Sequence, residues 1–137
     1  MIDHSCAFCA IMAGDLPARI VLEMPELICF FPPEPEMRGH TLIVTKSHYA
    51  DIRDCPPAIG ASLFEATQIL AMTYAARIGS TGFNLLNANG ADAEQSVQHL
   101  HVHFMPRFAK DGLSAWPSFP PFKADLDGLY KLLKIRN

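Results

Sequence analysis

Three histidines alternate with apolar residues in the last third of the chain. His99, His101 and His103 are separated by Leu100 and Val102, so the histidines recur with a period of two. In a β-strand this spacing places all three imidazoles on one face, about 6–7 Å apart. The pattern fits a half-exposed polar face, a metal site, or a catalytic face on which one imidazole is a nucleophile and its neighbour stabilises an anion. A chance polar face would carry mostly Thr, Lys or Glu, which argues against the first interpretation.

The elements that must position these histidines follow from apolar patterning and from Pro and Gly punctuation. Strands are expected at 19–23, 26–31, 40–45, 82–88 and 99–106. Helices are expected at 7–13, 58–78 and 125–135, and the middle one is long and amphipathic. We therefore expect an α+β fold, with a five-stranded antiparallel sheet, one long helix and short terminal helices. Residues 1–137 are expected to form a single domain.

Composition limits the classes of function. The chain has 137 residues, of which 50% are hydrophobic and 18% charged, and its formal net charge is −3. This balance argues against a general binder of nucleic acid or of anionic membranes, and no apolar run approaches the roughly 20 residues of a transmembrane helix. The N-terminal residues lack the basic and apolar segments of a secretory signal, so we expect a cytoplasmic protein with reduced cysteines.

The alternating histidines belong to a longer motif, His-φ-His-φ-His-φ-φ with φ apolar, which residues 99–105 (HLHVHFM) match at every position. The segments CAFCAIMAGDLPARIVLE, GHTLIVTKSH and GFNLLNANG extend the similarity over nearly the whole chain. On these motifs the sequence resembles the histidine triad nucleotide hydrolases and transferases, of the bacterial type. The resemblance implies a homodimeric enzyme without an organic cofactor. Such an enzyme would cleave nucleoside phosphoramidates or dinucleoside polyphosphates at the α-phosphorus, through a covalent nucleotidyl-histidine.

The resemblance also implies roles for individual residues. His101 matches the nucleophile, His103 the group that contacts the phosphate oxygens, and His99 the outer histidine that orients the site or binds a metal. The loop before the triad would contact the phosphate and the leaving group through Gln95, Ser96 and either Asn87 or Asn89. His40 matches a family position that supports the fold.

Cys6 and Cys9 form a Cys-x-x-Cys, which alone is a weak zinc signal. In bacterial members of the family, such a pair joins a histidine after the central strand and the first histidine of the triad. Those positions are held here by His48 and His99. The resemblance therefore implies a closed, structural Zn²⁺ site of Cys6, Cys9, His48 and His99. The alternative is a pair of unmetallated thiols.

Two residues depart from the family pattern. Pro32 stands where the family commonly has an aspartate that holds the ribose hydroxyls, and proline offers neither a side-chain acceptor nor an N–H. Glu94 replaces the usual glycine before Gln95, and it either repels a dianionic substrate or points to solvent. The first departure predicts a weaker affinity or an altered preference for nucleosides. Two other interpretations follow: a nucleotide-binding regulatory protein with weak or no catalysis, and a zinc-stabilised interaction protein.

Overall fold

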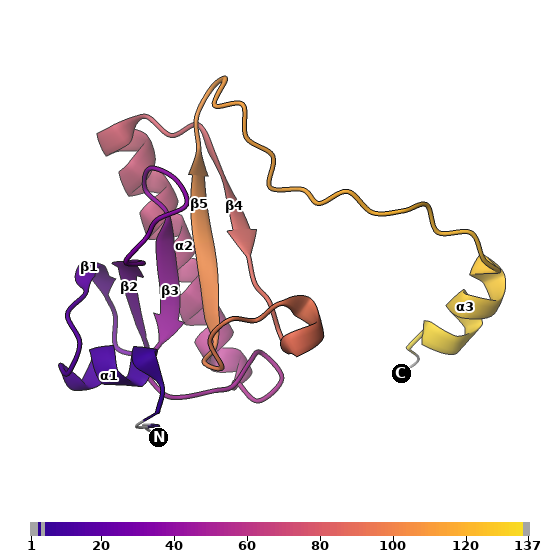
Figure 1. Cartoon of the computed structure of the whole chain (residues 1–137), viewed down its shortest axis with the longest axis horizontal. Helices are drawn as coiled ribbons and strands as arrows, with labels where there is room; N and C mark the ends of the chain where they lie inside the picture. Colours follow the sequence, from indigo (N-terminus) through magenta and orange to yellow (C-terminus); the bar gives the residue numbers. More distant parts are fainter. Residues whose placement is uncertain (1–2, 4, 136–137) are drawn as a thin grey trace.

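The computed structural model describes residues 3 and 5–135 as one sheet with helices on both of its faces (Figure 1). In chain order the elements are α1 (Ala7–Ala13), β1 (Arg19–Glu23), β2 (Leu27–Phe31), β3 (Thr41–Thr45), α2 (Pro57–Ile78), β4 (Gly82–Leu86), the 3₁₀ helix η1 (Ala91–Ala93), β5 (His101–Arg107) and α3 (Leu126–Leu133). The strands are ordered β1-β2-β3-β5-β4, and every neighbouring pair is antiparallel. The expected α+β fold with a five-stranded antiparallel sheet is confirmed.

The last strand begins at His101, two residues later than the sequence pattern predicts. Its first ladder partner is Val44 on β3, and Leu100 instead donates its N–H to the carbonyl of Tyr49, at 2.7 Å. His99 therefore lies in a bend before the strand rather than on it. The expectation that all three histidines lie on one strand is wrong for His99, because a backbone bond to the loop after β3 takes the chain out of the ladder at that point.

The period-two alternation of the central strands separates two cores. One core lies between the sheet and α2 and contains Leu70, Tyr74, Val102 and Phe104 among its buried residues. The other lies against α1 and contains Phe8, Cys9, Ile28, Phe30, Leu42 and Val44. Because His101 and His103 alternate with Val102 and Phe104 on β5, the two histidines project to the α1 side of the sheet. The long helix α2 thus covers the opposite face from the histidines.

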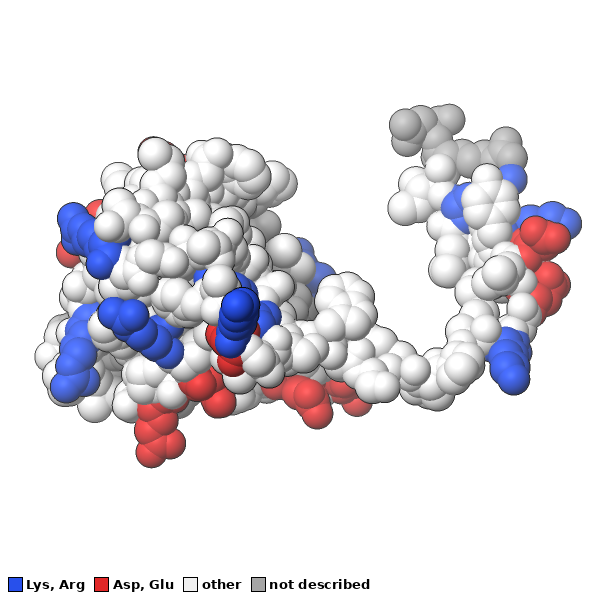
Figure 2. Space-filling view, turned by 90° about the horizontal axis from the view of Figure 1, so that it is seen from above, with Lys and Arg blue, Asp and Glu red and all other residues white. Residues whose placement is uncertain are grey.

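The chain after β5 leaves the sheet and runs as an extended segment to α3, which lies away from the body of the molecule in both views (Figure 1 and Figure 2). The Asp125 side chain accepts a hydrogen bond from the Gly128 N–H and so caps α3. Large apolar side chains along this segment are exposed, among them Trp116, Phe119 and Leu132. Across residues 3 and 5–135, none of the helices combines the length and apolarity that crossing a bilayer requires.

Gly39 forms the tight entry to β3 and gives a test of the fold. Its φ is +83°, and a Cβ there would lie 2.8 Å from Cγ of Pro106 and 3.2 Å from Cδ1 of Ile78. Gly14 has nearly the same φ, +82°, with nothing within 4 Å of a Cβ. We expect Gly14→Ala to lower the free energy of unfolding by about 1 kcal/mol through backbone strain alone, and Gly39→Ala by about 3 kcal/mol because overpacking is added. Urea unfolding of the wild type and both variants measures these free energies, and equal losses of unfolding free energy in the two variants would contradict the expectation.

Candidate active site and adjacent metal centre

His101 is held in one tautomer by the backbone of its own segment. Its Nδ1 lies 2.7 Å from the carbonyl oxygen of His99. A carbonyl can only accept a hydrogen bond, so Nδ1 carries the proton and the neutral ring keeps its lone pair on Nε2. The ring is buried, and burial lowers the pKa of His101, opposed in part by the carbonyl bond. The structure therefore presents a neutral imidazole with a free Nε2 lone pair, as a nucleophile requires.

His103 is held in the opposite tautomer by a chain of two hydrogen bonds. The Glu36 N–H donates to Nδ1 of His40 at 3.0 Å, so the proton of a neutral His40 is on Nε2. That Nε2 lies 2.9 Å from Nδ1 of His103, which must accept and therefore carries its own proton on Nε2. Burial, together with the neighbouring His101 and His40, lowers the pKa of His103 to about 4, and burial also lowers the pKa of His40. Both rings are neutral near pH 7.

The two triad rings are thus complementary. The ring centroids of His101 and His103 are 5.1 Å apart. His101 offers a lone pair on Nε2, and His103 offers an N–H on Nε2 to an oxygen of the same bound group. His40 belongs to this site, although the sequence analysis assigned it only to the fold. The antiparallel register pairs Leu42 with His103, which places His40 on the same sheet face as a diagonal neighbour, and this pairing was the signal that could have found it.

The loop after β4 supports the nucleophile through two predicted substrate-binding residues. The Asn87 side chain donates to the carbonyl oxygen of His101 at 2.9 Å. Asn89 donates to the Asn87 side-chain oxygen and accepts from the Ile52 N–H at 2.9 Å. In this structure both asparagines therefore hold the segment beside His101. Their contact with a substrate stays a prediction.

Gln95, another predicted substrate contact, is buried and its amide is fully engaged. It donates to the carbonyl oxygens of Ala50 at 2.7 Å and Val97 at 2.9 Å, and it accepts from the Gly90 N–H at 2.8 Å. The side chain closes the loop that precedes the triad. Ser96 follows it with an exposed side chain, so the serine is the more accessible of the two.

Glu94 lies immediately before Gln95 in the left-handed region, with φ +64°. Glycine adopts this conformation without a steric penalty, which explains physically why the family prefers glycine there. The Glu94 side chain is exposed, as one of the two expectations for this residue stated. The glutamate therefore places backbone strain, rather than a buried charge, beside the triad.

An apolar cavity of about 780 Å³ lies beside α1, on the face of the sheet to which His101 projects. Phe8 lines the cavity, and its ring meets the His101 ring edge-on with centroids 5.1 Å apart. Phe30, Phe31 and Pro33 form the wall contributed by the end of β2 and the residues after it. No acidic side chain is among its lining residues within the described part of the chain. The cavity has the apolar character that suits a planar base or another aromatic group.

The structure brings together the four residues that the sequence analysis assigned to a metal. Cys6 and Cys9 come from α1 and its N-terminal boundary, His48 from the loop after β3, and His99 from the bend before β5. Their ligand atoms all lie within 4.8 Å of one another. Cys6 Sγ is 3.3 Å and Cys9 Sγ 3.6 Å from His99 Nδ1, which in turn is 3.2 Å from His48 Nδ1.

These separations fit a tetrahedral ion. Zinc bonds of about 2.3 Å to sulfur and about 2.0 Å to nitrogen place neighbouring ligands about 3.3–3.8 Å apart. Nε2 of His99 lies 2.7 Å from the Thr45 carbonyl oxygen and donates to it, which leaves the lone pair of a neutral His99 on Nδ1, directed at the cluster. Burial raises the pKa of the Cys9 thiol, so a bound cation is what would favour the thiolate. The cluster could hold a metal ion.

An α+β fold whose antiparallel sheet carries alternating histidines, beside an apolar cavity, defines a histidine triad protein. The chain belongs to the HIT family, because the model of the HIT domain matches residues 13–110. The chain is 32% identical over 126 residues to the adenylylsulfatase HINT3 of Arabidopsis thaliana, covering 92% of this chain and 64% of that protein. It is 32% identical over 118 residues to the adenosine 5′-monophosphoramidase hnt1 of Schizosaccharomyces pombe, covering 85% and 86% of the two chains.

A solved structure described as a Zn-bound histidine triad family protein from Mycobacterium smegmatis superimposes with a TM-score of 0.77. It is 36% identical in sequence, and the match covers 81% of each chain. The named activities of the two sequence relatives support a HIT hydrolase, and the solved structure supports the fold.

Proposed function

We propose that this protein cleaves a bond at the α-phosphorus of a nucleotide conjugate, with His101 as the nucleophile. Nucleoside phosphoramidates and dinucleoside polyphosphates are the proposed substrate classes. The observation that carries the proposal is the opposite tautomers of His101 and His103. Nδ1 of His101 donates a hydrogen bond, and Nδ1 of His103 accepts one. A purely structural histidine face has no need of a free lone pair next to a free N–H.

The proposed reaction has two displacements. Nε2 of His101 forms a bond to phosphorus as the leaving group departs with the electrons of its bond to phosphorus. The substituted ring becomes cationic, and the His99 carbonyl that accepts from Nδ1 stabilises this charge. The N–H of His103 donates to a phosphoryl oxygen. Water then attacks phosphorus and releases a proton to solvent, which balances the proton that the departed leaving group takes up. The bond to Nε2 breaks, and its electron pair returns to His101.

His101→Asn tests the proposal. With adenosine 5′-phosphoramidate as substrate, we expect kcat to fall by about 10³-fold or more, while binding of AMP changes by less than about threefold. Mass spectrometry of wild type quenched in alkali, where a phosphorus–nitrogen bond to imidazole is stable, should find one nucleotidyl group on His101. Gln98→Ala, an exposed neighbour, serves as the control and should retain turnover. A wild type that binds AMP but turns over no conjugate would instead support the regulatory, non-catalytic interpretation.

We further propose that the Cys6, Cys9, His48 and His99 cluster binds a structural Zn²⁺. The four donors supply two sulfurs and two nitrogens, a closed set that leaves no position for substrate. Such an ion would join α1 to the loop after β3 and to the bend before β5. Its contribution would be to stability and to the placement of His99, whose carbonyl holds the nucleophile.

Metal analysis of protein purified without nickel or chelators tests the zinc site. We expect about one zinc per chain in the wild type and less than about a tenth of that in Cys9→Ser, with a lower melting temperature. Cys55→Ser is the matched control, because Cys55 is half-buried but lies outside the cluster. A zinc content near zero in the wild type, or an equal loss of zinc in both variants, would reject the site.

The lack of an acidic group in the cavity beside His101 supports an altered preference for the sugar. Pro32 directly follows β2, where it supplies neither an N–H nor a side-chain acceptor for a ribose hydroxyl. We expect kcat/KM for adenosine 5′-phosphoramidate and its 2′-deoxy analogue to differ by less than about threefold, and Pro32→Asp to favour the ribose form by about tenfold. Pro35→Asp, at an exposed proline three residues further along the chain, should leave this ratio unchanged. Strong ribose preference in the wild type would refute this proposal.

We also propose that the protein is a homodimer. Phe83 and Leu85 on the edge strand β4 are exposed, and so is Phe64 on the neighbouring α2. Sedimentation velocity should show a dimer for the wild type and a monomer for Phe64→Glu, because a charge would be buried in the interface. Ile20→Glu, on the opposite edge strand β1, is a matched control: Ile20 is 52% exposed and Phe64 67%. A monomeric wild type would exclude this assembly.

A further inference from the structure

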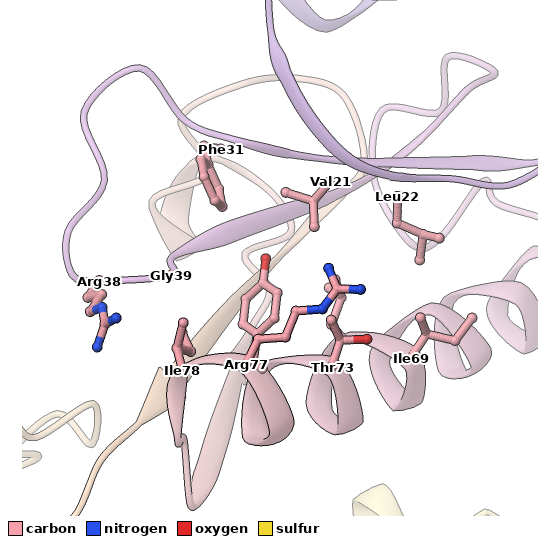
Figure 3. A pocket seen from close by; sticks show the side chains of 11 residues that line it. Val21, Leu22, Phe31, Arg38, Gly39, Ile69, Thr73, Arg77 and Ile78 are labelled. Carbon is pink, nitrogen blue, oxygen red and sulfur yellow. The ribbon is translucent and has the colours of Figure 1, made fainter.

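A second cavity lies on the other face of the sheet, between β1 and α2 (Figure 3). Its volume is about 600 Å³, within the range of small-molecule sites. Val21 and Leu22 line it from β1, and Ile69 and Ile78 line it from α2. This cavity is separated from the triad by the sheet, because His101 and His103 project to the α1 side. The role proposed above for the triad does not involve it.

Arg77 brings a positive charge to this apolar cavity. Figure 3 shows its guanidinium in the space between α2 and the strand that carries Val21 and Leu22. Among the described residues, no acidic side chain forms an ion pair with Arg77. A cation in the last turn of α2 also interacts favourably with the helix dipole, but that interaction needs only proximity to the terminal carbonyls. That interaction does not by itself require the guanidinium to line the cavity.

The other polar groups of the lining are already engaged, with one exception. The Tyr74 hydroxyl is 2.6 Å from Oγ1 of Thr41, and the Thr41 hydroxyl donates to the Gly39 carbonyl oxygen at 2.9 Å. The Arg38 guanidinium lies over the Phe108 ring, with Cζ 5.9 Å from the centroid. Thr73 is the exception, because its hydroxyl has no hydrogen bond to another residue in the described part of the chain. It lies one turn before Arg77 on α2 and therefore on the same face of the helix. Arg77 and Thr73 are thus the pair that a ligand would meet.

We propose that this cavity binds a small organic anion with an apolar body. The carboxylate, or an equivalent single anionic group, would accept hydrogen bonds from the Arg77 guanidinium and the Thr73 hydroxyl. The apolar body would lie along Val21, Leu22 and Ile69. Charge complementarity selects an anion, because the lining contains no carboxylate and its free donor is a guanidinium. The proposal does not depend on catalysis by the triad.

A nuclear magnetic resonance titration of the full chain tests the proposal, with octanoate as the probe and octanamide as its neutral isostere. Octanoate should shift the amide signals of Val21 and Thr73 saturably, and should bind about tenfold more tightly than octanamide. Arg77→Met keeps the aliphatic stem. It should weaken the binding of octanoate by about tenfold while leaving the binding of octanamide unchanged. Arg77→Lys should be intermediate, because it retains the charge but loses the forked donor.

Two controls locate the ligand. Arg19→Met removes an exposed arginine that lines the cavity beside His101, and it should leave octanoate binding unchanged. Ile69→Trp should block binding by filling the mouth of the proposed cavity. Three results would overturn the proposal: equal affinity for octanoate and octanamide, an unchanged affinity for octanoate in Arg77→Met, or loss of octanoate binding in Arg19→Met. A crystal structure with octanoate that showed the cavity filled by α3 of a neighbouring copy would overturn it as well.

Discussion

The hydrogen bond from Nδ1 of His101 to the carbonyl oxygen of His99 joins the two parts of the site. It can form only because His99 lies in a bend, which directs its carbonyl toward His101 and its ring toward the cysteines. The Leu100 N–H secures that bend through the Tyr49 carbonyl, and His99 Nε2 is bonded to the Thr45 carbonyl. The geometry of the nucleophile thus depends on backbone atoms of the loop after β3 and of the end of that strand.

The second ring of the site depends on a different backbone contact. The Glu36 N–H sets the tautomer of His40, and His40 sets that of His103. Because Gly39 lies between these two points, the tight turn into β3 is also part of the active-site support. Two short backbone segments, on opposite sides of β3, therefore determine which nitrogen of each imidazole is free.

The sequence predicted the architecture, because period-two alternation and Pro–Gly punctuation are local signals. The four metal-ligand candidates came from the resemblance to the histidine triad family, since a Cys-x-x-Cys alone is a weak zinc signal. The sequence did not predict that β5 begins at His101, since that boundary depends on a tertiary bond to Tyr49. It also did not place His40 in the site, because the contact with His103 requires the register of β3 against β5. Gln95 shows the same limit. The family resemblance suggested a substrate contact for Gln95, and only the folded loop reveals that its amide is hydrogen-bonded to the backbone.

Phe8 has a position that couples the two halves of this face. It lies on α1 one residue before Cys9, meets the His99 ring with centroids 5.6 Å apart, meets the His101 ring at 5.1 Å, and lines the apolar cavity. With the proposed Zn²⁺ in place, the metal and an occupant of the cavity would order the same helix. Thermodynamic linkage then requires the metal and the occupant to change each other's affinity by the same factor. With the proposed site occupied, zinc availability would enter the apparent substrate affinity of a protein whose zinc never touches the substrate.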